Sequence, residues 1–302
     1  MLFLIIFSGI SHAFKYFAPS VYDFAVDPEN KKYQEHSGFV HRHYYTEDKN
    51  HFGEIALMTL NTHVESDIVE KNQKNGILAL IDLHHPAVFA LQGLTQSVLS
   101  GVQKEASEHY EVACTDALFK EIRTNKLEVM PIFYDSNSLI KIKESIIEPE
   151  KYKNQAYACV VVFYDKLIQK IYTVINVDLP STDPKVIDSQ VYNIIHNLEN
   201  SKFKDFPVFV VGTINTMSEE LRKLVKRDMK NLIDQDKNNI GLRKTTFHNH
   251  GTVNDNLQRD FILLKDKAKE FKLNYSRILS RYSKMSFEHF PVFSILSRSS
   301  IN

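Results

Sequence analysis

The sequence predicts an α/β protein, in which short buried strands alternate with amphipathic helices. Two observations support this fold class. Short apolar runs rich in β-branched residues end in glycine or polar residues, as in PVFVVGTINT from Pro207 to Thr216, and such runs are typical of buried strands. Longer stretches between them place apolar residues on one helix face, as Ile187, Val191, Ile194 and Leu198 show.

The composition is that of a folded protein without a strong electrostatic preference. Of the 302 residues, 43% are hydrophobic and 25% are charged, and the length suits one large domain or two small ones. Lys+Arg and Asp+Glu both number 37. This balance excludes a general attraction to nucleic acid or anionic membranes, so nucleic-acid binding would need a local basic patch.

Residues 1–13, MLFLIIFSGISHA, predict a signal peptide. Leu2–Ile10 form an uncharged apolar core, and the small residues Ser11 and Ala13 suit cleavage by a signal peptidase. The apolar run is too short to span a bilayer, which needs about 20 residues. We therefore expect cleavage after Ala13 and a secreted protein, with a buried N-terminal strand as the alternative.

Residues 14–53 predict an irregular arm, because they are rich in aromatic residues and histidines and show no clear period. His41 and His43 would share one face of a strand, but no Cys or carboxylate spacing completes a metal site around them. We interpret them as surface histidines. Residues 54–302 have a regular pattern without a linker or internal repeat, and they predict the main domain.

The order of strands and helices follows from these patterns. Strands are predicted at Ile55–Asn61, Ala87–Gln92, Glu128–Tyr134, Ala158–Tyr164, Ile171–Val177, Val208–Val211, Asp260–Leu264 and Pro291–Leu296. Helices are predicted at Asp67–Leu83, from Thr95 onwards, at Val186–Leu198 and at Leu221–Ile233.

The last predicted helix carries basic residues opposite its apolar stripe. They are Arg222, Lys223, Lys226, Arg227 and Lys230. Such a face could contact the phosphates of a nucleic acid, but a solvated helix surface is our preferred interpretation.

Polar residues gather at the ends of the predicted strands. They are Asn61, Gln92–Gly93, Asn176–Asp178, Gly212–Asn215 and Glu288–His289, and Asp260 begins its own strand. Because α/β proteins commonly build their sites at strand ends, we expect a site in this region.

Seven short motifs in this order resemble those of the endonuclease/exonuclease/phosphatase superfamily, which has the DNase I-like fold. The motifs are LMTLN, VFALQG, VMPIFYD, TVINVDL, VVGTIN, RDFILL and FEHFPV, and they extend over about residues 54–297. The resemblance implies a four-layer α/β sandwich, with two packed β-sheets flanked by helices. It also implies metal-assisted hydrolysis of phosphate esters, in which a divalent ion polarises the phosphoryl group.

Four residues match catalytic positions of this superfamily. Asn61, Asn215, Asp260 and His289 stand where the family motifs have the same residue types. The resemblance implies that Asp260 orients His289 at the mouth of a cleft that Asn61 and Asn215 also line. Glu288 replaces a family aspartate and is a weak candidate metal ligand.

Three other positions depart from the family pattern. Gly93 replaces the principal metal-binding glutamate, Thr213 replaces an aspartate, and Asp178 replaces a phosphate-contacting histidine. Glycine has no side-chain oxygen for a metal, threonine cannot accept a proton at neutral pH as a carboxylate can, and Asp178 would repel phosphate. We interpret the chain as a pseudoenzyme that binds no catalytic metal and acts through an unidentified protein partner.

Two other functions stay open at this point. One is a metal-dependent phosphoesterase with a rearranged site, in which Asp178, Glu288 and Glu65 hold Mg²⁺ or Mn²⁺. The other is nucleic-acid binding without cleavage, through the basic face from Arg222 to Lys230.

Two cysteines occur in the chain, Cys114 and Cys159. A secreted protein could join them in a disulfide. We slightly favour two separate buried thiols, since two cysteines do not make a disulfide framework.

Overall fold

The computed structural model describes residues 53–63, 70–116, 118–120, 127–148, 157–179, 181, 183–215, 222, 228–236, 245–247, 258–279 and 287–299. The predicted signal peptide and all of the N-terminal arm except Gly53 lie outside these residues. So do Glu65, Lys223, Lys226 and Arg227.

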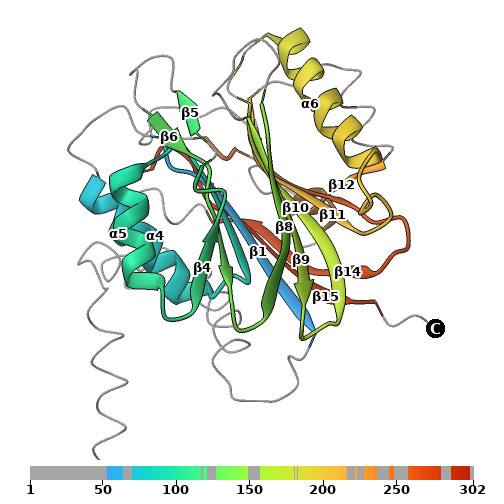
Figure 1. Cartoon of the computed structure of the whole chain (residues 1–302), viewed down its shortest axis with the longest axis horizontal. Coiled ribbons are helices and arrows are strands. Elements are labelled where there is room, and N and C mark those ends of the chain that lie inside the picture. The colour runs from blue at the N-terminus through green and yellow to red at the C-terminus, as the bar shows by residue number, and fades with distance from the viewer. Residues whose placement is uncertain are drawn as a thin grey trace, which may run out of the picture.

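Two six-stranded sheets form the centre of the molecule (Figure 1). The first sheet has the order β14 (Phe271–Ile278), β15 (Val292–Arg298), β1 (Glu54–Asn61), β2 (Val88–Gln92), β7 (Ile132–Asp135) and β4 (Tyr110–Ala113). The second has the order β12 (Lys230–Asn231), β13 (Asp260–Lys265), β11 (Val208–Ile214), β10 (Lys170–Leu179), β9 (Ala158–Asp165) and β8 (Leu139–Ile147).

Each of these sheets contains one parallel pair of strands, β1 with β2 and β10 with β11. The other pairings within the two sheets are antiparallel. A third, small sheet consists of β3 (Leu94–Thr95), β6 (Leu127–Val129) and β5 (Leu118–Lys120).

Three apolar clusters separate four layers. One lies between the two large sheets and includes Leu57, Val174 and Phe209. A second joins the first sheet to α4 (Glu70–His84) and α5 (Gln96–Ala106), and a third joins the second sheet to α6 (Pro184–Glu199). Figure 1 shows the helices on the two outer sides. The predicted α/β sandwich, with two packed β-sheets flanked by helices, is therefore confirmed.

Local sequence explains these elements. β11 reads VFVVGTI and is buried along its whole length, as expected for a strand covered on both faces by apolar layers. Helix α6 begins at Pro184, and the side chain of Asp183 accepts a hydrogen bond from the backbone N–H of Lys185. This cap and the fixed φ of proline define where the helix starts.

The predicted strand at 128–134 is wrong as a single strand. β6 ends at Val129 and belongs to the small sheet, whereas β7 begins at Ile132 in the first large sheet. Met130 and Pro131 separate them. Proline has no N–H for a strand ladder, but its carbonyl accepts a hydrogen bond from the N–H of Leu91 at 3.0 Å.

The predicted helix at 221–233 is also wrong at its end. Lys230 and Asn231 form β12, which pairs with Leu264 and Leu263 of β13, and the helix α8 covers only Leu232–Gln235. The apolar residues of α8 point into the core between the sheets. Lys230 therefore does not lie on one helical face with Arg222.

Strands without continuous apolar runs were not predicted. β8 reads LIKIKESII and is an exposed edge strand over most of its length, while β4 and β14 mix polar and apolar residues. Within the described ranges, no helix is long and apolar enough to cross a membrane.

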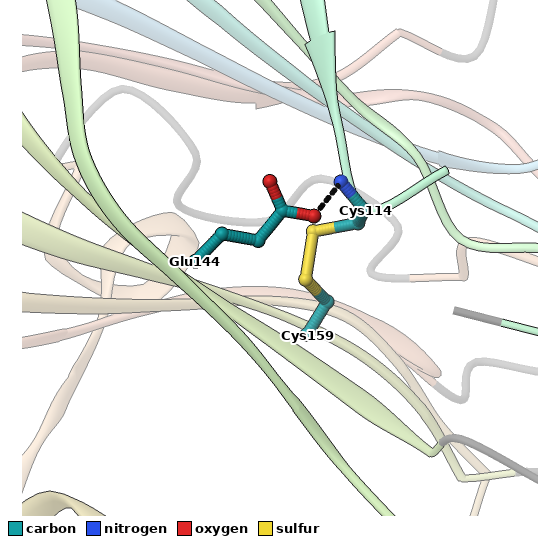
Figure 2. Close-up of side chains that lie close together, drawn as sticks. All are labelled: Cys114, Glu144 and Cys159. Atoms are coloured by element: carbon teal, nitrogen blue, oxygen red, sulfur yellow. Dashed lines mark hydrogen bonds between the residues drawn. A yellow bond between two sulfur atoms is a disulfide. The ribbon is translucent and has the colours of Figure 1, made fainter. Parts of the chain in front are cut away.

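The expectation of two separate buried thiols is wrong, because a disulfide joins Cys114 and Cys159 (Figure 2). Cys114 follows β4 in the first sheet, and Cys159 lies in β9 of the second. Both residues are fully buried in the core between the sheets. The sequence left this pairing open because spacing alone does not place two cysteines in contact.

Candidate functional site

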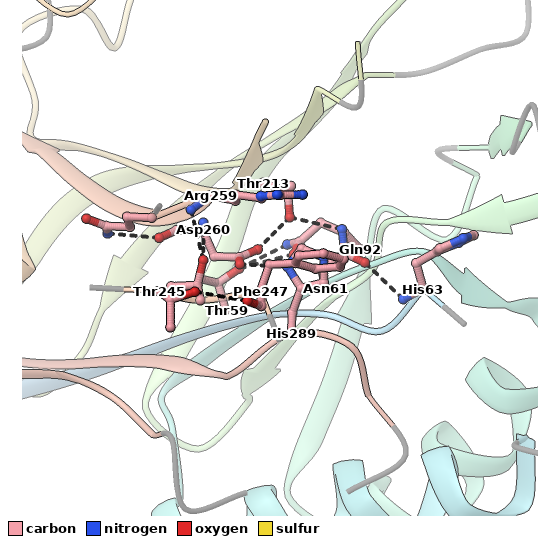
Figure 3. A network of polar contacts seen from close by, with 12 residues as sticks. Thr59, Asn61, His63, Gln92, Thr213, Thr245, Phe247, Arg259, Asp260 and His289 are labelled. Carbon is pink, nitrogen blue, oxygen red and sulfur yellow. Dashed lines mark hydrogen bonds and ion pairs between the residues drawn. The ribbon is translucent and has the colours of Figure 1, made fainter. Parts of the chain in front are cut away.

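The site lies between the two large sheets, where the carboxyl ends of their parallel strand pairs meet. Asn61 and Gln92 are paired at the ends of β1 and β2, and Asp178 and Thr213 are paired near the ends of β10 and β11. Side chains from both sheets reach into this region, as Figure 3 shows for Asn61, Gln92 and Thr213.

A chain of hydrogen bonds crosses the site from one sheet to the other. The amide Nδ2 of Asn61 donates to Oγ1 of Thr213 at 3.0 Å, and that hydroxyl donates to Oδ1 of Asp260 at 2.6 Å. Oδ2 of Asp260 lies 2.7 Å from Nδ1 of His289. The predicted contact between His289 and Asp260 is therefore present, and Asn61 belongs to the same network.

The carboxylate of Asp260 fixes the orientation of His289. Because Oδ2 of Asp260 is an acceptor, Nδ1 of His289 carries the proton, and Nε2 is the nitrogen left for other contacts. The backbone N–H of Asp260 donates to Oγ1 of Thr246 at 2.9 Å. The aspartate is thus held by its backbone and by both of its carboxylate oxygens.

Aromatic and cationic side chains cover His289. The ring of Phe247 meets the imidazole edge-on at a centroid distance of 4.9 Å, and the guanidinium of Arg259 lies 4.2 Å from the centre of the Phe247 ring. Asp260 is 0% exposed and His289 only 7%. The pair is therefore buried, and its place at the mouth of a cleft stays a prediction.

A second polar network joins the sheets below the site. Nε2 of Gln92 donates to Oδ1 of Asn176 at 2.6 Å and to Oγ1 of Thr59 at 3.0 Å. Nδ2 of Asn176 donates to the carbonyls of Leu91 and Met130. These side chains are buried, so their hydrogen bonds replace those that water would otherwise make. They hold the two strand ends in register.

Gly93 has a backbone conformation that suits glycine. Its φ is +66°, and a Cβ placed there would lie 3.0 Å from both Cβ and the backbone nitrogen of His63. A side chain with a Cβ is strained in the left-handed region. The position that resembles the family's metal-binding glutamate is therefore filled by the neighbouring His63.

His63 forms a second histidine–carboxylate pair that sequence reasoning missed. Its Nδ1 lies 3.0 Å from Oε1 of Glu128, and its backbone N–H donates to Oδ1 of Asn61 at 2.9 Å. The side chain of Glu128 is 4% exposed and that of His63 is 19% exposed. The available signal was the place of His63, two residues after Asn61 at a strand end.

Asp178 is a buried carboxyl group close to both histidine pairs. Its pairing with Thr213 in parallel strands places their side chains on one face, toward the space between the sheets. Burial raises the pKa of Asp178 to about 7; Glu128 and Asp260 add to this rise, whereas His63 and His289 oppose it. Within the described residues, no hydrogen bond reaches this carboxyl group.

Asn215 and Glu288 complete the predicted set. Asn215 follows β11 and is half-buried, and its backbone N–H donates to the carbonyl of Leu179 at 3.3 Å. Glu288 is buried next to His289. Among the described side chains, only Cys114, Glu144 and Cys159 bring three metal-ligand atoms within 4.8 Å of one another. Glu288 and Asp178 therefore belong to no such group.

These residues do not fit the magnesium site that the fold family implies. Gly93 offers no oxygen, and the hydroxyl of Thr213 is already engaged by Asn61 and Asp260. Magnesium requires near-octahedral oxygen ligands and is normally held through carboxylates. The geometry instead forms a hydrogen-bond network in which Asn61, Thr213, Asp260 and His289 satisfy one another's polar groups.

Comparisons with solved structures agree on the architecture. An endonuclease/exonuclease/phosphatase from Bacteroides vulgatus superposes with a TM-score of 0.66 at 14% identity, covering 82% of this chain and 99% of its own. The human Nocturnin catalytic domain with bound sulfate gives a TM-score of 0.65 at 13% identity, covering 82% and 95%. The chain has the endonuclease/exonuclease/phosphatase fold. At these identities the similarity shows the fold alone.

Sequence comparison adds a relative that matches this chain over nearly the whole length of both proteins. An uncharacterized protein of Encephalitozoon cuniculi is 26% identical over 290 residues, which cover 95% of this chain and 92% of the relative. No family model matches the sequence. The assignment of the endonuclease/exonuclease/phosphatase fold thus rests on the structure and on the order of the sequence motifs.

Proposed function

We propose that this chain is a secreted pseudoenzyme of the endonuclease/exonuclease/phosphatase superfamily, which acts by binding a protein partner. The observation that carries the proposal is the hydrogen bond from Thr213 to Asp260. In this arrangement the residue that replaces a family aspartate is part of an internal network. It neither activates water nor holds a metal.

The position of Gly93 supports the same proposal. Its left-handed backbone and its contact with His63 leave no room for the glutamate that the family motif has. A single changed residue could leave a weakened enzyme, since metal sites tolerate some loss of affinity. Here the metal ligand, the aspartate and the phosphate-binding histidine are all replaced, and residues that act as a unit do not fail additively.

Secretion rests on two features. The apolar segment Leu2–Ile10 is followed by small residues that suit signal-peptide cleavage. The disulfide between Cys114 and Cys159 is of the kind that forms in oxidising compartments. Mass spectrometry of protein from a eukaryotic secretory host should show cleavage after Ala13, and an intact N-terminus would contradict this part of the proposal.

The decisive assay compares the wild type with His289→Ala, using DNA, RNA and small phosphate esters in the presence of Mg²⁺ or Mn²⁺. We expect no hydrolysis above a buffer blank for either protein. Loss of one transition-state donor typically lowers a rate by about 10²–10³-fold, and this chain lacks several groups at once. Metal-dependent turnover that disappears in His289→Ala would overturn the proposal.

One observation favours the alternative, a phosphoesterase with a rearranged metal site. Asp178 lies within electrostatic range of Glu128, His63 and His289, and these are side-chain types that bind divalent cations. Such an enzyme would use Mg²⁺ or Mn²⁺ through residues other than those of the family. A calorimetric titration of the purified protein with each metal separates the two functions, because the pseudoenzyme should give no binding heat.

A further inference from the structure

The disulfide has a carboxylate beside it at one edge of the β-sandwich. Cys114 directly follows the edge strand β4, Cys159 lies in β9, and Glu144 lies in the edge strand β8. The two sulfurs and a carboxylate oxygen of Glu144 all lie within 4.8 Å of one another (Figure 2). Three strands thus bring three metal-ligand atoms together.

Strand register explains why Glu144 faces the sulfurs. In the pairing of β8 with β9, Ile146 is opposite Cys159 and Glu144 is opposite Val161. Residues two apart on a strand share one face. Cys159 and Val161 both belong to the core between the sheets, so Glu144 points toward this core.

The backbone around the cysteine also favours this contact. The N–H of Cys114 donates to Oε1 of Glu144 at 2.7 Å, and Nζ of Lys141 lies 2.8 Å from Oε2. Cys114 has a φ of +66°, which is uncommon for a residue other than glycine. The Glu144 side chain is 27% exposed, and these two contacts hold its carboxylate beside the sulfurs. Reduction of the disulfide would therefore leave two thiols and a carboxylate close together, which are ligand types that zinc accepts.

We propose that Cys114, Cys159 and Glu144 bind one Zn²⁺ when the disulfide is reduced. Zinc prefers tetrahedral sites with thiolate ligands and accepts a carboxylate or water in the remaining positions. Zn–S bonds of about 2.3 Å place two thiolates about 3.8 Å apart. The Cα atoms of the cysteines are 6.1 Å apart, so side-chain rotation is sufficient for this separation.

Reduction and zinc binding together convert the disulfide form into the zinc-bound form. Two small-molecule thiols reduce the disulfide, giving two cysteine thiols in the protein and one small-molecule disulfide. On zinc binding the two cysteines each release a proton, and the ion takes two thiolates, the carboxylate of Glu144 and one water. The three anionic ligands and Zn²⁺ leave one negative charge, which Lys141 offsets from its place beside Glu144.

The test uses the full chain expressed in a reducing bacterial cytoplasm with added zinc and purified without oxygen. Elemental analysis should give one zinc per protein with both thiols free, whereas the oxidised protein should hold none. Replacement by Co²⁺ should produce the thiolate-to-cobalt absorption and the visible bands of a tetrahedral site. A reduced, folded protein without these bands would overturn the proposal.

Variants identify the ligands. Cys159→Ser should abolish Co²⁺ binding, and Glu144→Gln should weaken it at least about tenfold, although it keeps an acceptor for the N–H of Cys114. Glu148→Gln, just beyond the end of β8 and exposed, is the matched control and should bind as the wild type does. Equal affinity in Glu144→Gln and Glu148→Gln would contradict the assignment of Glu144.

If the reduced chain does not fold, circular dichroism tests the proposal by following folding with and without zinc. Zinc-dependent recovery of the folded spectrum would support the site, because binding free energy then appears as folding free energy. A reduced chain that stays unfolded with and without zinc would overturn it.

Discussion

Thr213 donates its hydroxyl hydrogen to Asp260 across 2.6 Å while accepting a hydrogen bond from Asn61 at 3.0 Å. One small side chain therefore satisfies a buried donor on one sheet and a buried carboxylate on the other. An aspartate at this position would bring a second negative charge against Asp260. The threonine thus fits a site that is held together without a metal ion.

Replacing Thr213 by valine, which has nearly the same shape, should destabilise the protein. The change leaves the amide of Asn61 and one oxygen of Asp260 without their partner, and a buried unsatisfied group costs about 1–3 kcal/mol. Urea denaturation measures the loss. Thr115→Val, at a half-buried position, is the matched control and should change stability by no more than about 0.5 kcal/mol. Equal losses in the two variants would show that the network is not stabilising.

Replacing Gly93 by alanine should also destabilise the protein, by roughly 1–2 kcal/mol for the left-handed backbone alone. The close approach to His63 adds to this cost. Gly101→Ala is the control. Gly101 lies within helix α5, and its added Cβ would meet only the flexible end of Lys74. That variant should be neutral or more stable, by up to about 1 kcal/mol.

The backbone geometry at Gly93 also affects a variant in which the family residues are restored. The triple variant Gly93→Glu, Thr213→Asp, Asp178→His should bind magnesium more tightly than the wild type if the resemblance extends to the site. The strain at Gly93 predicts that this variant folds less stably, so a magnesium titration must be accompanied by a stability measurement. Tight binding without loss of stability would show that the backbone at Gly93 readily accepts a side chain.

Asp178 should make stability depend on pH. Its pKa in the folded protein is about 7, above the ordinary value of 3.8, so the folded state retains a proton that the unfolded state releases. The stability that the protonated Asp178 provides relative to the ionised form is fully present below about pH 4 and is lost as the pH rises through 7. The difference corresponds to roughly 4 kcal/mol, at about 1.4 kcal/mol for each pKa unit.

Asp178→Asn should remove this dependence. The variant should be more stable than the wild type at pH 8 by a few kcal/mol, and the difference should shrink toward pH 4. The exposed Asp205→Asn is the control and should show no such trend. A pH-independent difference for Asp178→Asn would show that the carboxyl group has the same pKa in the folded and unfolded states.

The sequence was sufficient to predict those strands that are buried on both faces. β1, β10 and β11 are rich in apolar residues and buried over most of their length, because layers cover both of their sides. Edge strands such as β8 face water, so their composition carried no comparable signal. The break in the 128–134 segment depends on which sheet each half joins, and that is a tertiary property.

The site was predictable in part for a similar reason. His289 and Asp260 belong to motifs with a fixed order, so their contact could be inferred from the resemblance. The pair of His63 and Glu128 joins residues 65 positions apart in sequence, and no motif links them. The burial of the site also depends on Phe247 and Arg259, whose contacts the sequence does not specify.

The disulfide should contribute measurably to stability. It joins cysteines 45 residues apart, and closing a loop of that length lowers the entropy of the unfolded chain by an amount equivalent to about 4 kcal/mol. Cys114→Ala, Cys159→Ala and the double variant should each lose about 2–4 kcal/mol relative to the oxidised wild type in urea denaturation. The two single effects should not add, because either substitution removes the whole cross-link. Additive losses would instead indicate that each cysteine stabilises the core by its own packing, as two separate buried thiols would.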